Sequence, residues 1–270
     1  MRLIAKIGLL LFVLMNTALS QTREKVSIVQ GVLLLNQIQV VLAAKITQTL
    51  QANWGLKATE LKVGKDGISF KTAGIQFVLK QINKPLLTDE IFETAKVAYL
   101  WPEAETEIKK HRAQWLLTAV QGDTKKLKVY EVFTKVASVC LKNADATGIY
   151  FGRKMVLLSK VFYVAEAEVL RKGVIPMNNW VYVGSVSKDG IQSVYTYGLT
   201  LFGKQEMEIV DSKRPTAELR GLLYNLISYV LKDDVVLKEE EAIVLDKDNR
   251  LIVHIFEGKF IQGPTIKIEY

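Results

Sequence analysis

Glu206 and Glu208 are the residues whose type and spacing most suggest chemistry. Side chains two residues apart on a strand point to the same face, so these two carboxylates would lie together. Paired carboxylates can bind a cation or divide acid and base roles between them. Alternating charge on the solvent-facing side of a half-buried strand explains the pair equally well. Gly198 and Gly203 precede the glutamates in the stretch 196–209 and predict a bend in this strand.

His111 is the second candidate, because the chain contains only two histidines. Glu107 lies four residues earlier and would share one helical face with it, a spacing that suits two metal ligands or an acid–base pair. A closed metal site needs more ligands than this, so we favour a capping or hydrogen-bonding histidine before the strand 115–120. His254 lies in the apolar stretch 251–256, which is typical of a histidine held within a core or edge strand.

The sequence lacks the common catalytic motifs. It has no glycine-rich phosphate loop, no HExxH, no GxSxG nucleophile elbow and no CxxC pair. Cys140 is the sole cysteine and falls in an apolar helical pattern, where a thiol acts as a small hydrophobic side chain. We therefore expect no metal and no cofactor, and the candidate catalytic residues are limited to His111, Glu107, Glu206 and Glu208.

Residues 28–120 predict a ferredoxin-like, split βαβ unit. A helical pattern of apolar residues ends at Trp54, and Thr88 is a good N-cap for a later helix. Strand, helix, two strands, helix, strand is the ferredoxin-like order. The expected strands are rich in β-branched and apolar residues and lie at 28–36, 60–72, 74–81 and 115–120.

Residues 125–260 predict a related α/β arrangement with a mixed or antiparallel sheet. Apolar stripes at helical spacing indicate helices at 125–140, at 154–172 and after Pro215. Together the two segments predict an α+β fold in which two halves pack as a single domain spanning 21–270. The expected strands of the second half lie at 147–151, 180–185, 191–196, 242–245 and 250–256.

Residues 1–20 have the layout of a secretory signal peptide. Arg2 and Lys6 precede the apolar run 7–15, and small or polar residues end at Ser20 before Gln21. The run is shorter than the roughly 20 residues of a membrane span, although an uncleaved N-terminal anchor is the alternative. Cleavage would leave 270 − 20 = 250 residues, no transmembrane segment and a net charge of 8 − 2 = +6. We expect a periplasmic or secreted protein.

The lysines and arginines are spread along the chain and interleave with acidic residues. A nucleic-acid-binding protein usually gathers its basic residues in a dense patch, so we expect no nucleic-acid partner. The positive net charge would suit an anionic membrane surface or an acidic partner. A solvated surface is the simpler interpretation.

A set of motif residues is spread over both halves of the chain: Trp101, Pro102, His111, Ala113, Trp180, Thr196, Gly198, Leu199, Phe202, Gly203, Glu206 and Glu208. The segments that contain them resemble the uncharacterised bacterial family catalogued as domain of unknown function 4261, over roughly residues 28–260. The chain departs from the family at Gln114, where a second His is common, and at Tyr197, where Thr is common. The Gly-Leu…Phe-Gly…Glu-x-Glu pattern is also similar to one in the suppressor-of-fused-like group, whose bacterial members are suspected immunity proteins against toxins.

Three functions follow from these observations. The first, which we favour, is a non-enzymatic binding or protein-interaction domain with an unknown protein partner, immunity-like by analogy only. The second is a metal-assisted or acid/base enzyme, which requires His111, Glu206 and Glu208 to meet in one pocket. The third is a small-ligand carrier, which requires a deep apolar pocket.

Overall fold

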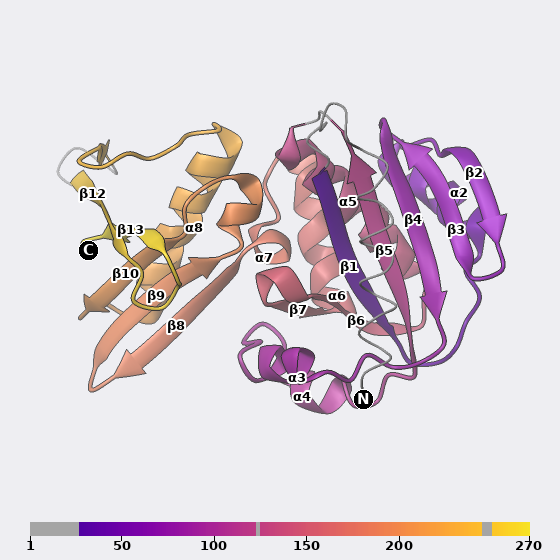
Figure 1. Ribbon diagram of the computed structural model, residues 1–270, viewed down its shortest axis with the longest axis horizontal. Coiled ribbons are helices and arrows are strands. Elements are labelled where there is room, and N and C mark those ends of the chain that lie inside the picture. Colours follow the sequence, from indigo (N-terminus) through magenta and orange to yellow (C-terminus); the bar gives the residue numbers. More distant parts are fainter. Residues whose placement is uncertain (1–26, 123–124, 245–249) are drawn as a thin grey trace, which may run out of the picture.

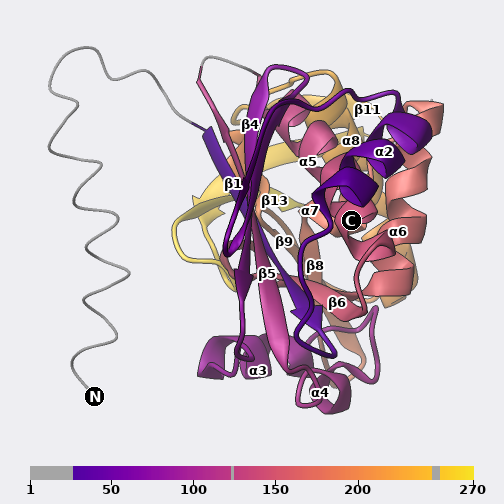
Figure 2. The ribbon, with the colours of Figure 1, turned by 90° about the vertical axis from the view of Figure 1, so that its right-hand side faces the viewer.

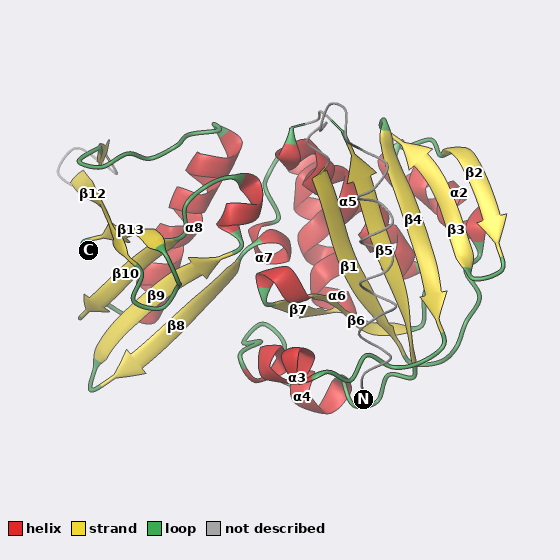
Figure 3. Ribbon diagram, in the orientation of Figure 1, coloured by secondary structure: helices red, strands yellow, loops and turns green. Residues whose placement is uncertain are grey.

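The computed structural model describes residues 27–122, 125–244 and 250–270. Two sheets lie side by side, each with its own helices (Figures 1 and 3). The expected signal peptide, residues 1–20, and the turn 246–249 between two expected strands lie outside the described residues. The α+β class and the two packed halves are confirmed.

The strands are β1 (Ser27–Leu35), β2 (Thr59–Gly64), β3 (Gly67–Thr72), β4 (Ile75–Ile82), β5 (Ala113–Gln121), β6 (Ala146–Phe151), β7 (Val156–Ser159), β8 (Tyr182–Lys188), β9 (Ile191–Tyr197), β10 (Met207–Ser212), β11 (Ala242–Val244), β12 (Arg250–Glu257) and β13 (Pro264–Ile268). The α-helices are α2 (Ala43–Trp54), α3 (Asp89–Lys96), α4 (Ala104–Glu107), α5 (Lys126–Lys142), α6 (Lys160–Ala167), α7 (Met177–Trp180) and α8 (Thr216–Lys232). The 3₁₀ helices are η1 (Gly152–Lys154), η2 (Glu168–Lys172) and η3 (Leu199–Phe202).

The first sheet has seven antiparallel strands in the order β2-β3-β4-β5-β1-β6-β7. Figure 2 shows α2, α5 and α6 together on one face of this sheet. Alternate residues of β1, β3, β4 and β5 point to that face, and their apolar side chains are buried there, whereas β2 at the edge is exposed. The buried set from three central strands includes Val29, Leu33, Phe77, Leu79, Trp115 and Leu117.

The strand order differs from the ferredoxin-like expectation. A ferredoxin-like sheet would place the first strand, β1, between β4 and β5, whereas β5 pairs directly with β4 and lies between β4 and β1. The connection that carries α3 and α4 therefore joins neighbouring antiparallel strands. Figure 1 shows these two helices below the end of the sheet, where Trp101 and Ile108 pack with Tyr150 in a small second core.

Two expected helices start later than their apolar patterns predicted. The apolar pattern that ends at Trp54 begins at Ile38, but the helix begins only at Ala43. Residues 36–42 are not helical, because Gln39 is held by tertiary contacts: its backbone oxygen accepts from Trp115 Nε1 at 3.3 Å and its side chain from Asp145 N at 2.9 Å. The expected helix 154–172 begins at Lys160, because β7 pairs with β6 instead. Tertiary hydrogen bonds at Gln39 and the β6–β7 ladder therefore outweigh local helical spacing at these two places.

The second sheet has the order β11-β12-β13-β10-β9-β8, with one parallel pair, β10 and β13. Helix α8 packs on β8 and β9 through the expected apolar stripe. The boundary between the sheets lies after β7, later in the chain than the expected junction near residues 120–125. The buried residues of this stripe are Leu219, Leu222, Leu223, Leu226, Ile227, Val230 and Leu231.

One hydrophobic core runs through both halves. At their boundary, Trp180 of α7 packs against Tyr130 of α5 and Phe202 of η3, with ring centroids 6.0 and 5.8 Å away. The Trp180 indole also donates to Thr134 Oγ1 at 2.8 Å. Within the described ranges, the helices are too short or too polar to span a membrane.

Candidate functional site

Glu206 is a buried residue just before β10, and its carboxylate holds the loop that contains η3. It accepts hydrogen bonds from Gly198 N at 2.8 Å, Thr200 N at 3.1 Å and Thr196 Oγ1 at 2.8 Å. Thr196 Oγ1 in turn accepts from Met207 N at 2.8 Å. The carboxylate therefore joins the end of β9, the η3 turn and the start of β10.

The two motif glycines permit this turn. Gly198 has φ +119° and Gly203 has φ +78°, both in the left-handed region that favours glycine. A Cβ at position 198 would also lie 3.3 Å from the Trp180 carbonyl oxygen. The turn directs Leu199 and Phe202 into the core, and the Phe202 ring lies 4.3 Å from Tyr130. The expected bent strand is thus two strands joined by a 3₁₀ turn.

Glu208 is fully buried in β10 and holds a second loop. Its carboxylate accepts from the backbone N–H groups of Lys259, Phe260 and Ile261 at 2.9, 2.9 and 3.1 Å, and it forms an ion pair with Lys267. Burial alone would raise the pKa of Glu208, but the hydrogen bonds from Lys267 and the loop outweigh it and hold the pKa below its ordinary value.

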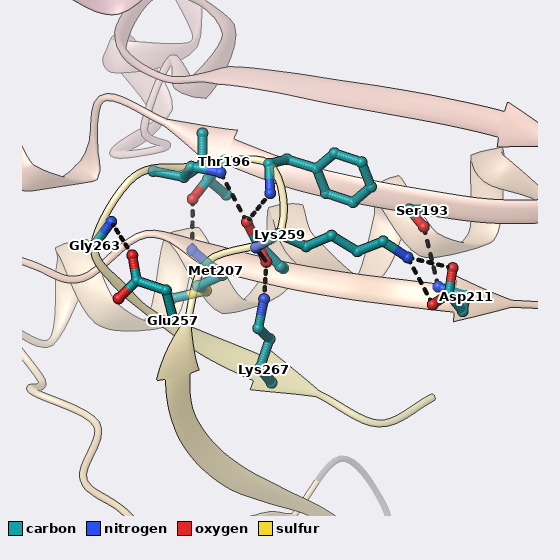
Figure 4. Close-up of polar contacts among 11 residues, drawn as sticks. Ser193, Thr196, Met207, Asp211, Glu257, Lys259, Gly263 and Lys267 are labelled. Carbon is teal, nitrogen blue, oxygen red and sulfur yellow. Dashed lines mark hydrogen bonds and ion pairs between the residues drawn. The ribbon is translucent and has the colours of Figure 1, made fainter.

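Further contacts fix the loop that Glu208 holds, as Figure 4 shows. The Lys259 ammonium lies 2.7 Å from both carboxylate oxygens of Asp211, and Gly263 N donates to Glu257 at 3.0 Å. The backbone of Gly258 and Gly263 is also hydrogen-bonded across the loop, at 2.9 Å.

The solvent-face interpretation of the two glutamates is therefore wrong, since both are buried. Among the residues that the structure describes, the two glutamates also share no hydrogen-bond partner: Glu206 bonds to the η3 loop, and Glu208 bonds to residues 259–261 and Lys267. Among the described residues, no group of three His, Cys, Asp or Glu side chains could hold a metal ion. Each carboxylate instead accepts hydrogen bonds that hold a neighbouring loop in place.

The candidate histidine is likewise occupied by backbone groups. His111 is 1 % exposed; its Nε2 accepts from Leu86 N at 2.7 Å and its Nδ1 is bonded to the Ile108 carbonyl. Burial lowers the pKa of His111, against the opposing effect of the Ile108 bond. Glu107 forms an ion pair with Lys110 at 2.6 Å.

These contacts show that His111 is a hydrogen-bonding residue just before β5, as the sequence analysis favoured. His111 lies just before β5 of the first sheet, whereas Glu206 lies just before β10 and Glu208 within β10 of the second. Among the described residues, no hydrogen bond or ion pair joins His111 to either glutamate. His254 is partly exposed on β12 and lies 3.2 Å from a Glu239 carboxylate oxygen.

Of the remaining motif residues in the first half, Trp101 and Ala113 are packed in the interior and Pro102 is not. Trp101 is buried against Gly148, where an added Cβ would lie 2.6 Å from the indole ring. Pro102 is exposed and follows Trp101 into the α4 turn. Ala113 is fully buried and opens β5 opposite Leu35.

A cavity of about 230 Å³ lies on the first half, next to η3. Residues 28–32 of β1 form one side of it, and Leu201 of η3 also lines it. Tyr130 and Phe151 give it aromatic lining, while Glu90 and Arg153 supply charges. A concave site with aromatic walls and a few charged groups is the usual form of a binding site.

Lys154 also lines this cavity and is 3 % exposed. Its ammonium donates to the Asn179 carbonyl at 3.2 Å and lies over the rings of Phe151 at 4.1 Å and Tyr130 at 4.8 Å. Burial lowers the pKa of Lys154 to about 7. Among the described residues, no carboxylate forms an ion pair with it. Buried charges are normally paired.

The sequence analysis did not single out Lys154. Its neighbours Gly152 and Arg153 look like an ordinary turn, and the apolar residues after it suggested a helix. The burial of this lysine arises from α5, α7 and η3 packing around it, and those elements are distant in sequence.

Comparison with known protein families gives one finding. Residues 195–269 match the family described as Domain of unknown function (DUF4261), which confirms the resemblance over this segment. The match contains Thr196, Gly198, Phe202, Glu206 and Glu208 of the motif, and it is shorter than the expected span of 28–260. No curated protein and no solved structure matches the chain.

Proposed function

Because residues 195–269 belong to a family of unknown function, we propose a function from the geometry: an exported, non-enzymatic protein that binds a partner protein at the cavity beside β1. The observation that carries this proposal is the cavity itself, in which the buried Lys154, which forms no ion pair with any described carboxylate, faces aromatic walls. The residues first considered for catalysis support binding over enzymatic activity, since His111, Glu206 and Glu208 are each engaged in internal hydrogen bonds.

Export is part of the proposal and rests on the layout of residues 1–20. A protein in the periplasm or outside the cell would meet partners there. An immunity-like role, in which the partner is a toxin, is one form of this function. The small-ligand carrier is the second candidate, because a cavity of about 230 Å³ could also enclose a small molecule.

The experiment that tests the proposal is capture of partners from native periplasmic and membrane fractions by three forms of the full-length protein. The forms are wild type, Ile28→Arg and Ile252→Arg. Both isoleucines are exposed on strands, at 48 % and 41 %, but only Ile28 lines the cavity. Mass spectrometry identifies the captured proteins and small molecules, and the intact mass of each form is measured after expression in native cells.

We expect wild type and Ile252→Arg to retain the same protein in stoichiometric amount, and Ile28→Arg to lose it. Capture that is equal for all three forms would contradict binding at the cavity. A metabolite retained by wild type and lost by Ile28→Arg, with no protein, would favour the carrier instead. A mass that lacks residues 1–20 is expected, and a full-length mass would contradict export by a cleaved signal peptide.

A further inference from the structure

Strand β1 has a free edge along its N-terminal half. It pairs with β5 over its whole length, Ser27–Leu35, but with β6 only from Val32 onward. Figure 1 shows α5 behind the upper part of β1, with no strand on that side. Among the described residues, nothing is paired with the β6 side of residues 27–31.

The direction of the backbone groups follows from the ladder. The Leu35 carbonyl accepts from Arg112 N at 2.7 Å, on the β5 side, and Asn36 N donates to Asp145 O at 2.9 Å, on the β6 side. Alternate residues of an antiparallel strand direct both N–H and C=O to the same neighbour. Ile28 and Gln30 therefore present their N–H and C=O groups to the free side.

The cavity of about 230 Å³ runs along this free edge. Tyr130 and Leu201 line it together with β1, so the edge is recessed beside other elements. A recessed edge has room for a single extended segment more readily than for the flat edge of another sheet. Addition of one strand to a free edge is a recurrent mode of peptide recognition.

The charges beside the edge indicate the chemistry of the segment. Lys154 and Arg153 both line the cavity, and Glu90 is the only acidic residue among the described lining residues. A ligand carboxylate next to the Lys154 ammonium would supply the missing counter-ion in a water-poor site, where charge-assisted hydrogen bonds are strong.

We propose that this cavity takes an extended segment of the partner protein, which adds to the free edge of β1 as a strand and places a carboxylate at Lys154. This inference rests on the proposed function and specifies its binding mode.

The surroundings of Lys154 couple the binding of a carboxylate to the uptake of protons. The groups that face Lys154 come from four elements: Tyr130 from α5, Asn179 from α7, Phe151 and Arg153 from the β6–η1 segment, and Gly198 beside η3. Glu90 from α3 also lines the cavity, and its carboxylate lies beside Gly152. Because burial lowers the pKa of Lys154 to about 7, this amine is only partly protonated near neutral pH. A carboxylate bound beside it would raise that pKa, so binding would take up protons.

The probe is a displayed library of short random peptides with free C-termini, selected on the full-length protein. The selected peptide is then synthesised with N-methyl groups at one residue after another. Strand addition uses every second peptide N–H, so N-methylation is expected to weaken binding about tenfold or more at alternate residues and little at those between, about 1.4 kcal/mol per tenfold change.

The carboxylate contact is tested separately, by replacing each acidic group of the peptide with its amide. Wild type should bind the acid form about tenfold more tightly than the amide form, and Lys154→Met should bind the two forms equally. Should Lys154→Met fail to fold, calorimetry of wild type in two buffers of different ionisation enthalpy gives the same information: uptake of protons with the acid peptide only.

Each other result overturns the proposal in a recognisable way. Ile28→Arg could abolish peptide binding while N-methylation shows no alternation along the peptide. That result would rule out strand addition but would remain consistent with the proposed function. Failure to select any peptide sensitive to Ile28→Arg would overturn the proposed mode, and partner capture would then decide the function. A dimer dissociated by Ile28→Arg would assign the edge to a second copy of this chain.

Discussion

At the scale of single residues, three buried ionisable side chains behave differently because of what surrounds them. Glu206 accepts hydrogen bonds from two backbone N–H groups and Glu208 from three, so both buried carboxylates have their polar atoms paired. Lys154 faces two aromatic rings and a single carbonyl, which compensate its charge only in part. The glutamates therefore stabilise loops, whereas the lysine is a cost to folding at neutral pH.

Lys154 should make stability depend on pH. Its pKa is about 7 in the folded protein and 10.5 ordinarily, so between these values the unfolded chain binds more protons and stability rises with pH. The slope from this group approaches about 1.4 kcal/mol per pH unit. Urea unfolding at about pH 7 and about pH 9 measures it.

Lys154→Met should lack this contribution, while Lys172→Met, at an exposed position of η2, should keep the wild-type slope. If the free energy of unfolding of wild type and of Lys154→Met changed equally between the two pH values, the pH dependence would not come from Lys154.

At the scale of elements, the family motif builds the turn between β9 and β10. Glu206 satisfies the first N–H groups of the η3 turn, and the left-handed glycines on both sides let the chain reverse. The turn places Phe202 against Tyr130, so the motif fixes how the second sheet contacts α5. A sequence motif can thus identify a family through a folding requirement.

Gly198→Ala should lower the free energy of unfolding by about 1 to 3 kcal/mol, the cost of a non-glycine residue in a disfavoured backbone region. The Cβ would also press on the Trp180 carbonyl. Gly173→Ala is the matched control: its φ is +68° and an added Cβ meets nothing within 4 Å, so its cost should be clearly smaller. Thermal or urea unfolding of both variants checks the difference, and equal losses would contradict a specific role for Gly198.

At the scale of the whole molecule, the two sheets share one hydrophobic core. The boundary is closed by Trp180, Tyr130 and Phe202, and Tyr224 of α8 also lies 3.0 Å from the Tyr99 hydroxyl of the first half. Separation of the halves would expose this aromatic surface to water. The halves therefore depend on each other for stability.

We expect a single cooperative unfolding transition. Fluorescence of the four tryptophans reports on the first sheet and the boundary, whereas far-ultraviolet circular dichroism reports on both sheets. The two signals should give the same urea midpoint, which is the test for two-state behaviour. Separate midpoints would mean that the sheets unfold independently.

The local sequence determined much of the secondary structure of this protein. The strands around residues 28–36 and 74–81, the Thr88 cap and the α8 stripe from Leu219 to Val230 all appear as expected, because hydrophobic periodicity and capping chemistry act over a few residues. The α+β class followed from these elements. The motif residues Thr196 to Glu208 lie within residues 195–269, which match the family that they were expected to resemble.

Tertiary structure alone decided the strand order and the site. Insertion of β5 between β4 and β1 depends on pairings across long stretches of chain, and spacing does not encode them. Spacing placed Glu206 and Glu208 together, but burial and separate loops gave each its own partners. Lys154 and the free edge of β1 acquired their character only when α5, α7 and η3 enclosed the cavity, since pKa and accessibility depend on neighbours distant in sequence.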